Sequence, residues 1–270
     1  MNYTKMHGAG NGFVLLDNTQ NILLPEDFSS LAVYLCRLED TDGMILITEA
    51  ADADCGMYFY NRDGSAGEMC GNGVRCLARY AVEHGLASDP KHIRIRTAAG
   101  IVTSRQIDEI LYEVRLNNPS VIDLHRPVTV NGSVYDCFYT ELGDPGIPHA
   151  VFFLPDMLPK DLSSLRSLGR FLRSAPEFPK GANVTFVHQI SADSVDAITY
   201  ERGVEDFTLA CGTGCGATAA ALLLLGKSSA KMIRISMPGG LLTVALDICD
   251  GTVTSLYLTG PTAITGTGTV

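Results

Sequence analysis

Short apolar runs separated by glycine-rich turns dominate the chain, and this alternation predicts a protein built mainly of strands. Apolar residues at helical spacing predict helices over Glu26–Leu38, Cys70–Gly85, Asp161–Arg173 with Asp161 as the N-cap, and Cys211–Gly226. The expected strands are Phe13–Asp17, Gly43–Ile47, Gly56–Tyr60, several between His92 and Tyr139, Ala150–Leu154, Lys231–Met237, Leu241–Ile248 and a last one reaching Pro261. Strands around one such helix per half indicate an α+β fold with mostly antiparallel sheet.

The sequence contains one motif twice. Cys70-Gly71-Asn72-Gly73 opens the second predicted helix, and Cys211-Gly212-Thr213-Gly214 opens the fourth, 141 positions later. Ile93-Arg94-Ile95 is followed 140 positions on by Ile233-Arg234-Ile235. A repeat this long predicts two similar domains rather than a solenoid. We expect pseudo-symmetric domains of residues 1–118 plus 262–270 and residues 119–261, with the active site in the cleft between them.

Composition narrows the class of protein. With 46% hydrophobic and 19% charged residues among 270, the chain has enough apolar surface for a sizeable core. A net charge of −10 without a basic run argues against a nucleic-acid partner. The longest apolar stretch, Ala217–Leu225, is too short for a membrane span. Eight cysteines without an apolar leader predict free thiols in a reducing cytoplasm.

The two repeated cysteines are the candidate chemical groups. A thiol at a helix N-terminus lies beside unpaired N–H groups and the positive end of the helix dipole. That position is expected to lower the thiol pKa and make the thiolate usable as a base. One thiolate could take a proton from carbon while a thiol on the opposite face returns one, which inverts a stereocentre. Gly71–Gly73 and Gly212–Gly214 offer unhindered N–H groups for the substrate carboxylate.

Other uses of these residues fit the spacing less well. The pairs Cys70/Cys76 and Cys211/Cys215 lack the Cys-x2-Cys spacing of zinc and thioredoxin-like sites, so we expect no metal. The glycines of Lys5–Gly12 precede a strand instead of a helix, which argues against a dinucleotide loop. They indicate instead a tight turn, which either presents Asn11 to a ligand or is purely structural. No lysine motif signals pyridoxal phosphate, and we expect no cofactor.

Six segments together resemble diaminopimelate epimerase, in the same order and over nearly the whole chain. They are Lys5–Asn11, Asn61–Ser65, Met69–Cys76, Pro148-His149, Gly181–Val184, and Glu201–Gly203 with Ala210–Gly214. The resemblance implies a cofactor-independent isomerase of two domains, each a sheet or barrel wrapped around a central helix. It implies conversion of LL- to meso-diaminopimelate, in lysine and peptidoglycan precursor synthesis, and it is consistent with a homodimer.

The resemblance also implies roles for individual residues. Cys70 and Cys211 correspond to the acid/base pair, and His149 and Glu201 to the groups that assist them. The residues implied to bind substrate are Asn11, Asn61, Gly71, Asn72, Gly73, Asn183, Arg202, Gly212 and Thr213. Among these, Arg202 suits a distal carboxylate because its planar guanidinium grips a carboxylate bidentately.

Four features depart from the family pattern: Gly12, Ile147, Phe207 and a short segment over residues 37–43. They concern substrate recognition more than the two thiols. Three hypotheses therefore stay open: diaminopimelate epimerase, a cofactor-independent racemase of another amino acid such as histidine, and a non-enzymatic amino-acid-binding relative. In each case the partner is a small amino acid.

Overall fold

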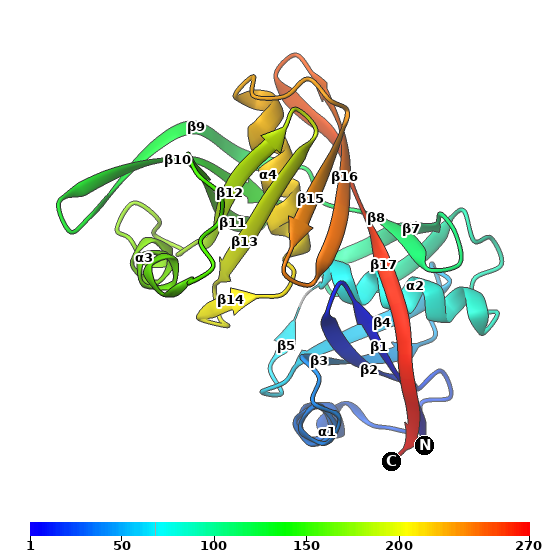
Figure 1. The fold of residues 1–270 in the computed structure, drawn as a ribbon. Helices are drawn as coiled ribbons and strands as arrows, with labels where there is room; N and C mark the ends of the chain where they lie inside the picture. The colour runs from blue at the N-terminus through cyan, green and yellow to red at the C-terminus, as the bar shows by residue number, and fades with distance from the viewer. Residues whose placement is uncertain (68) are drawn as a thin grey trace. The chain divides into compact units, whose positions relative to one another are not determined.

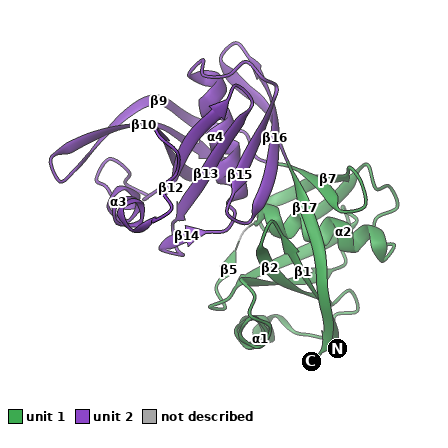
Figure 2. Cartoon of the chain, in the orientation of Figure 1, with its two compact units in different colours: residues 1–115, 259–270 green, residues 116–258 purple. Residues whose placement is uncertain are grey.

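The computed structural model describes residues 1–67 and 69–270, which form two compact units (Figure 2). Unit 1 comprises residues 1–115 and 259–270, and unit 2 comprises residues 116–258. Each unit has one helix surrounded by strands and one helix outside its sheet (Figure 1). The boundaries expected near residues 118 and 261 for two domains stay a prediction.

Unit 1 is a strand barrel. Its elements are β1 (Asn2–Gly8), β2 (Asn11–Asp17), α1 (Pro25–Glu39), β3 (Gly43–Thr48), β4 (Cys55–Asn61), β5 (Ala66–Gly67), α2 (Gly71–Glu83), β6 (Ile93–Thr97), β7 (Gly100–Gln106), β8 (Leu111–Arg115) and the second part of β17 (Thr252–Thr269). Pairing runs β17-β1-β2-β3-β4-β6-β7-β8, and β8 pairs with β17 again, which closes the barrel. The pairs β2–β3 and β4–β6 are parallel because a helix lies in each connection.

Helix α2 fills the inside of this barrel. The buried apolar side chains of the helix lie on more than one of its faces; they are Val74, Cys76, Leu77, Ala78, Tyr80 and Ala81. The helix stops where Gly85 takes a positive φ of 70°, a conformation that glycine adopts at little cost. The sequence pattern predicted that the helix over Cys70–Gly85 would end at this glycine.

Unit 2 repeats the arrangement of elements. It contains β9 (Pro119–Val130), β10 (Ser133–Leu142), β11 (Ile147–Leu154), α3 (Ser163–Arg173), β12 (Asn183–Ser191), β13 (Ser194–Glu201), β14 (Asp206–Thr208), α4 (Gly212–Leu224), β15 (Met232–Met237), β16 (Gly240–Cys249) and the first part of β17. The parallel pairs are β11–β12 across α3 and β13–β15 across α4, which matches the two parallel pairs of unit 1. Helix α4 is the central helix, since every residue from Gly214 to Leu222 is buried.

Helices α1 and α3 each cover a separate hydrophobic cluster on the outside of the strands. In unit 1 the cluster includes Phe28, Leu35 and Met44, and in unit 2 it includes Leu172 and Phe186. The prediction of Asp161 as the N-cap of α3 was wrong by one residue. Leu162 is the N-cap, and the Asp161 carboxylate instead accepts hydrogen bonds from the N–H and hydroxyl of Ser163 at 2.9 Å.

The predicted fold class is confirmed. Within residues 1–67 and 69–270, four helices and mostly antiparallel strands form two units with a similar order of elements, each built around a central helix. The two helices that start at the repeated cysteines are these central helices, α2 and α4. The cleft expected between the domains stays a prediction.

Candidate active site

Cys70 and Cys211 occupy equivalent positions at the starts of the two central helices. Each is the N-cap residue in an extended conformation, with φ and ψ of −132° and 112° for Cys70 and of −122° and 104° for Cys211. The carbonyl of Cys70 accepts the Val74 N–H at 2.8 Å, and that of Cys211 accepts the Cys215 N–H at 3.0 Å. Each sulfur therefore stands at the end of a helix that offers free N–H groups.

In unit 1 the side chains of Asn11 and Asn72 lie beside the Cys70 thiol. Asn11 begins β2 after a two-residue turn in which Ala9 and Gly10 have positive φ, as expected for the tight turn that the sequence predicted. The Asn11 Oδ1 lies 3.9 Å from the Cys70 sulfur and 3.4 Å from the Asn72 Nδ2. An oxygen that accepts hydrogen bonds therefore faces the thiol.

Arg75 supports this cluster from inside the barrel, and sequence reasoning missed it. It is fully buried, and it donates from Nη2 to the Asn72 Oδ1 at 2.9 Å and from Nη1 to the Gly71 carbonyl at 3.5 Å. A buried guanidinium is costly unless it is satisfied. An arginine three residues after Asn72, between the apolar residues Val74 and Cys76, was the sequence signal for this role.

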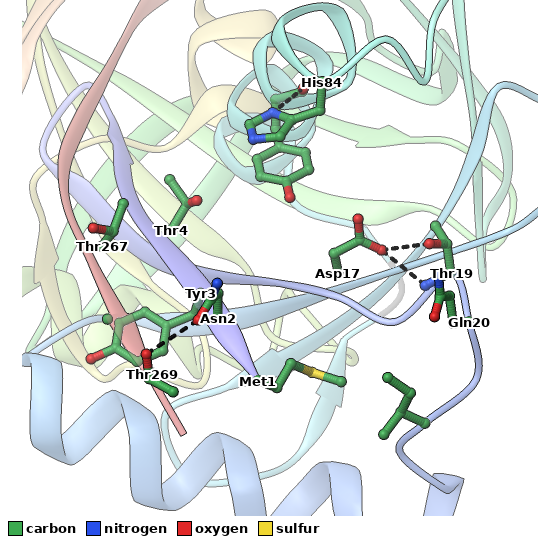
Figure 3. Close-up of a pocket in the computed structure, with 13 residues that line it drawn as sticks. Met1, Asn2, Tyr3, Thr4, Asp17, Thr19, Gln20, His84, Thr267 and Thr269 are labelled. Carbon is green, nitrogen blue, oxygen red and sulfur yellow. Dashed lines mark hydrogen bonds between the residues drawn. The ribbon is translucent and has the colours of Figure 1, made fainter.

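Asn61 belongs to unit 1, as Cys70 does, and lies at the end of β4. It ends β4 opposite Gly43, and its Nδ2 donates to the Ser65 hydroxyl at 3.0 Å. A hollow of about 750 Å³ in unit 1 lies elsewhere (Figure 3). It is lined by Tyr3, Asp17, Tyr80 and His84 among others, and by none of the predicted site residues. We therefore do not assign the chemistry to this pocket.

In unit 2 the Cys211 thiol is buried, with 5% of its surface exposed. Its sulfur lies 3.7 Å from the Thr213 hydroxyl. Burial raises the Cys211 pKa well above its ordinary value, and the charge of Glu201 raises it further. The Gly214 N–H and the Thr213 hydroxyl oppose this rise, because they donate to the thiolate.

The expected lowering of the thiol pKa by the helix start is therefore wrong for Cys211 in this form of the protein. Desolvation disfavours the thiolate by more than the helix-start donors favour it. At neutral pH Cys211 carries its proton. Glu201 lies at the end of β13. Its carboxylate accepts a hydrogen bond from the Thr208 hydroxyl at 3.0 Å, and this contact helps to hold the carboxylate in place.

A second cluster in unit 2 consists of His149, Asn183 and Arg202. The parallel register of β11 and β12 places His149 next to Asn183. The Asn183 side chain donates to the Pro148 carbonyl at 3.2 Å and accepts the Arg202 N–H at 2.8 Å, so it ties these two segments together. The Arg202 guanidinium donates to the Lys180 carbonyl at 2.8 Å.

The His149 imidazole is fully buried and electrically neutral. Burial, with the charge of Arg202, lowers its pKa to about 3. Neither ring nitrogen has a hydrogen-bond partner among residues 1–67 and 69–270. Buried polar groups are nearly always bonded, so this imidazole is suited to meet a group from a bound ligand.

Other features of the described chain bear on the sequence predictions. All eight cysteines are free. Within residues 1–67 and 69–270, no group of three or more His, Cys, Asp or Glu side chains is arranged to hold a metal ion. No helix in that same part of the chain is long and apolar enough to cross a membrane.

The fold is shared with solved proteins of low sequence identity. The structure is similar to that of a phenazine biosynthesis protein of the PhzF family from Bacillus anthracis, with a TM-score of 0.77, 13% identity, and coverage of 100% of this chain and 98% of the other. It is also similar to a hydroxyproline epimerase from Agrobacterium vitis, with a TM-score of 0.72, 17% identity, and coverage of 99% and 91%. At these identities the likeness concerns the fold.

Sequence comparisons identify the family. The family model described as Diaminopimelate epimerase matches residues 3–118 and 143–265. The chain is 36% identical to the diaminopimelate epimerase of Desulforudis audaxviator, over 97% of this chain and 96% of the relative. It is 34% identical to that of Carboxydothermus hydrogenoformans, over 98% and 97%. The chain belongs to the diaminopimelate epimerase family, and it is an isomerase.

Proposed function

We propose that the protein converts LL-diaminopimelate to meso-diaminopimelate without a cofactor, with Cys70 and Cys211 as the two acid/base groups. The observation that carries this proposal is the matched pair of cysteines, each the N-cap of the central helix of its unit. Family membership supports diaminopimelate as the substrate. On this proposal the protein acts in the cytoplasm, as a step of lysine and peptidoglycan precursor synthesis, and a homodimer is its expected assembly.

In the proposed reaction, one sulfur removes the α-hydrogen as a proton and the other sulfur donates its proton to the same carbon. The second step leaves a thiolate, so each site must tolerate both forms of its sulfur. At Cys211 the buried thiol is the resting form, and the Gly214 N–H and Thr213 hydroxyl are in place to receive the thiolate once it forms. No net acid or base is consumed.

The developing charge on the substrate requires donors near its carboxylate. The first-turn N–H groups of a helix take no part in its own i→i−4 hydrogen bonds, and the helix dipole favours an anion there. Gly71–Gly73 of α2 and Gly212–Gly214 of α4 hold these positions. We propose that Asn72 and Thr213, in the same two turns, complete these sites. Such pre-aligned donors stabilise an oxyanion strongly because they need no reorganisation.

The proposed roles of the other residues follow from their positions in each unit. The neutral His149, whose ring nitrogens have no hydrogen-bond partner in the described part of the chain, and the carboxylate of Glu201 would assist the thiols. Arg202, anchored through Asn183 and Lys180, would hold the distal carboxylate, with Asn11 and Asn61 as further contacts from unit 1. Asn183 would act mainly by holding Arg202, since both ends of its amide already bond to backbone groups.

A racemase of another amino acid is the second candidate. Ile147, where the family pattern has a polar residue before Pro148-His149, favours it, because an apolar side chain there removes a contact to the distal end of diaminopimelate. The same two cysteines would serve this reaction, so the two candidates differ only in substrate.

One assay separates the candidates. Reduced protein in deuterated water is incubated with LL-diaminopimelate and, separately, with a panel of L-amino acids that includes histidine, and deuterium at the α-carbon is measured by mass spectrometry. We expect exchange and inversion with diaminopimelate. Exchange with another amino acid alone would select the second candidate, and no exchange with any substrate would refute both.

A further inference from the structure

We infer that Asp42 is a positioning residue for the site: its carboxylate fixes the direction of the Asn11 side-chain amide, so that the amide oxygen, and not the nitrogen, faces Cys70 and Asn72. The inference rests on the proposed role of Cys70. Asp42 accepts the Asn11 Nδ2–H at 2.7 Å, and the same carboxylate oxygen accepts the Gly12 N–H at 2.7 Å.

A carboxylate can only accept hydrogen bonds, which makes the orientation of the amide a matter of chemistry. An asparagine amide has an oxygen at one end and an NH2 group at the other. With Asp42 on one side, the NH2 group must point toward the carboxylate, and the oxygen must point the other way. That is where the Cys70 sulfur lies at 3.9 Å and the Asn72 Nδ2 at 3.4 Å from the oxygen.

The opposite orientation would change the chemistry at Cys70. The Asn11 NH2 group would then face the sulfur and donate to it. It would also face the Asn72 Nδ2, and two NH2 groups cannot bond to each other. With the observed orientation, Asn72 stays bonded to Asn11 on one side and to Arg75 at 2.9 Å on the other. Asp42 therefore begins a chain of polar contacts that ends at the buried Arg75.

Asp42 is exposed, but its backbone is fixed. Its N–H donates to the Gly12 carbonyl at 2.9 Å, and its carbonyl accepts the Arg62 N–H at 3.0 Å. The next residue, Gly43, is in register with Phe13 in the parallel pair of β3 and β2. These contacts hold the carboxylate against the start of β2, where Asn11 and Gly12 lie, so its position does not depend on a flexible side chain alone.

The test compares variants that remove the same charge from the same loop. Asp42→Ala removes the acceptor, Asp42→Asn keeps its shape with a weaker acceptor, and Asp40→Asn is the matched control. The Asp40 carboxylate pairs with Arg62 at 2.8 Å, and within the described residues it makes no hydrogen bond to Asn11. Asn11→Ala and the Asn11→Ala/Asp42→Ala double variant complete a double-mutant cycle.

The first measurement is the side-chain amide signal of Asn11 in an ¹H–¹⁵N NMR spectrum, identified by its loss in Asn11→Ala. We expect this signal to move in Asp42→Ala and to stay in place in Asp40→Asn. The second measurement is kcat/KM for α-hydrogen exchange, which should fall roughly 10-fold in Asp42→Ala, the scale of one charge-assisted hydrogen bond. The decrease in kcat/KM should be smaller in Asp42→Asn. In the Asn11→Ala background, Asp42→Ala should cause no further decrease in kcat/KM.

An unmoved Asn11 signal in Asp42→Ala would overturn the inference, and so would losses that multiply in the double variant. If Asp42→Ala proves unfolded by its melting curve, the signal and rate of Asp42→Asn against Asp40→Asn decide in its place. If the wild-type protein exchanges no substrate, the proposed function fails, while the NMR measurement still decides whether Asp42 orients Asn11.

Discussion

The two helix-start cysteines share a backbone conformation but differ in their surroundings. Cys70 is half-buried, and an amide oxygen that accepts hydrogen bonds lies beside it in unit 1. Cys211 is buried in unit 2 between groups that donate, the Thr213 hydroxyl and the Gly214 N–H, and a carboxylate, Glu201, whose charge repels a thiolate. The duplicated motif thus gives each sulfur the same place at a helix start, while burial and the charge of Glu201, at the end of β13, raise the pKa of Cys211.

A helix N-terminus does not by itself determine whether a thiol is ionised. The helix contribution to a charge at its first turn is about 0.3–1 kcal/mol at exposed sites. Burial of a charged group shifts a pKa by as much as several units, which is a larger energy. In unit 2 burial therefore outweighs the helix, and the donors limit a shift that they cannot reverse.

The largest expected effect comes from removal of either sulfur. Cys70→Ala and Cys211→Ala should each lower the rate of inversion by about 10²–10⁴-fold, the usual contribution of a positioned acid or base. The rate of meso-diaminopimelate formation is followed by chiral chromatography, with Cys249→Ala as the control, because Cys249 is an exposed cysteine outside both helix starts. Unchanged inversion in either variant would remove that cysteine from the mechanism.

Alanine at the third position of each helix tests how tightly the two sites are packed. A Cβ on Gly214 would lie 3.0 Å from the Thr199 hydroxyl and 3.2 Å from the Cys211 sulfur. A Cβ on Gly73 would meet the ends of two flexible side chains, Ile45 at 3.0 Å and Met57 at 3.2 Å. Because Thr199 is β-branched and bonded to the Thr185 hydroxyl at 3.0 Å, it cannot yield as easily.

We therefore expect Gly214→Ala to destabilise the protein by about 1–3 kcal/mol, the cost of overpacking, and to displace the Cys211 sulfur. Gly73→Ala should cost less and retain more activity. Urea unfolding and exchange rates of the two variants provide the comparison. Equal losses in both would show that the two helix starts are packed alike.

Glu201→Gln tests the cause of the high Cys211 pKa. Removal of the negative charge removes a repulsion on the thiolate, so the Cys211 pKa should fall, and the thiol should ionise at a lower pH than in the parent. The rate of iodoacetamide labelling of Cys211 is measured against pH by peptide mass spectrometry, in a Cys70→Ala background. A labelling midpoint that stays in place or rises would contradict the assignment of Glu201 as a neighbour that opposes ionisation.

Local features of the sequence predicted much of the fold. The apolar runs gave α1, β3 and β4 to within one residue at each end, because alternation and helical spacing are local properties. The repeated Cys-Gly-x-Gly motif located both central helices. A family resemblance then supplied candidates for the site from both units.

The contacts that tune the site could not be read from local patterns. Asp42 lies 31 positions from Asn11 and reaches it only through the parallel pairing of β2 and β3. Arg75 was part of the recognised motif, but its burial beneath Asn72 depends on the closed barrel around α2. The direction of the Cys211 pKa shift was predicted wrongly because burial depends on tertiary packing, which the helix motif does not report.

The smallest expected effect is at Thr213, where one hydroxyl distinguishes the surroundings of Cys211 from those of Cys70. Thr213→Val keeps the shape of the side chain and removes the donor 3.7 Å from the sulfur, while Thr213→Ser keeps the hydroxyl. Because the hydroxyl lowers the Cys211 pKa, its loss should raise that pKa further, and labelling of Cys211 should require a higher pH in the valine variant than in the serine variant. The rate of α-hydrogen exchange should fall by roughly 2–5-fold in Thr213→Val, as expected for one weak hydrogen bond of about 0.5–1 kcal/mol. If the two variants behave alike in labelling and in exchange, the hydroxyl contributes nothing to the thiolate, and the Gly214 N–H remains as the donor that opposes the effect of burial.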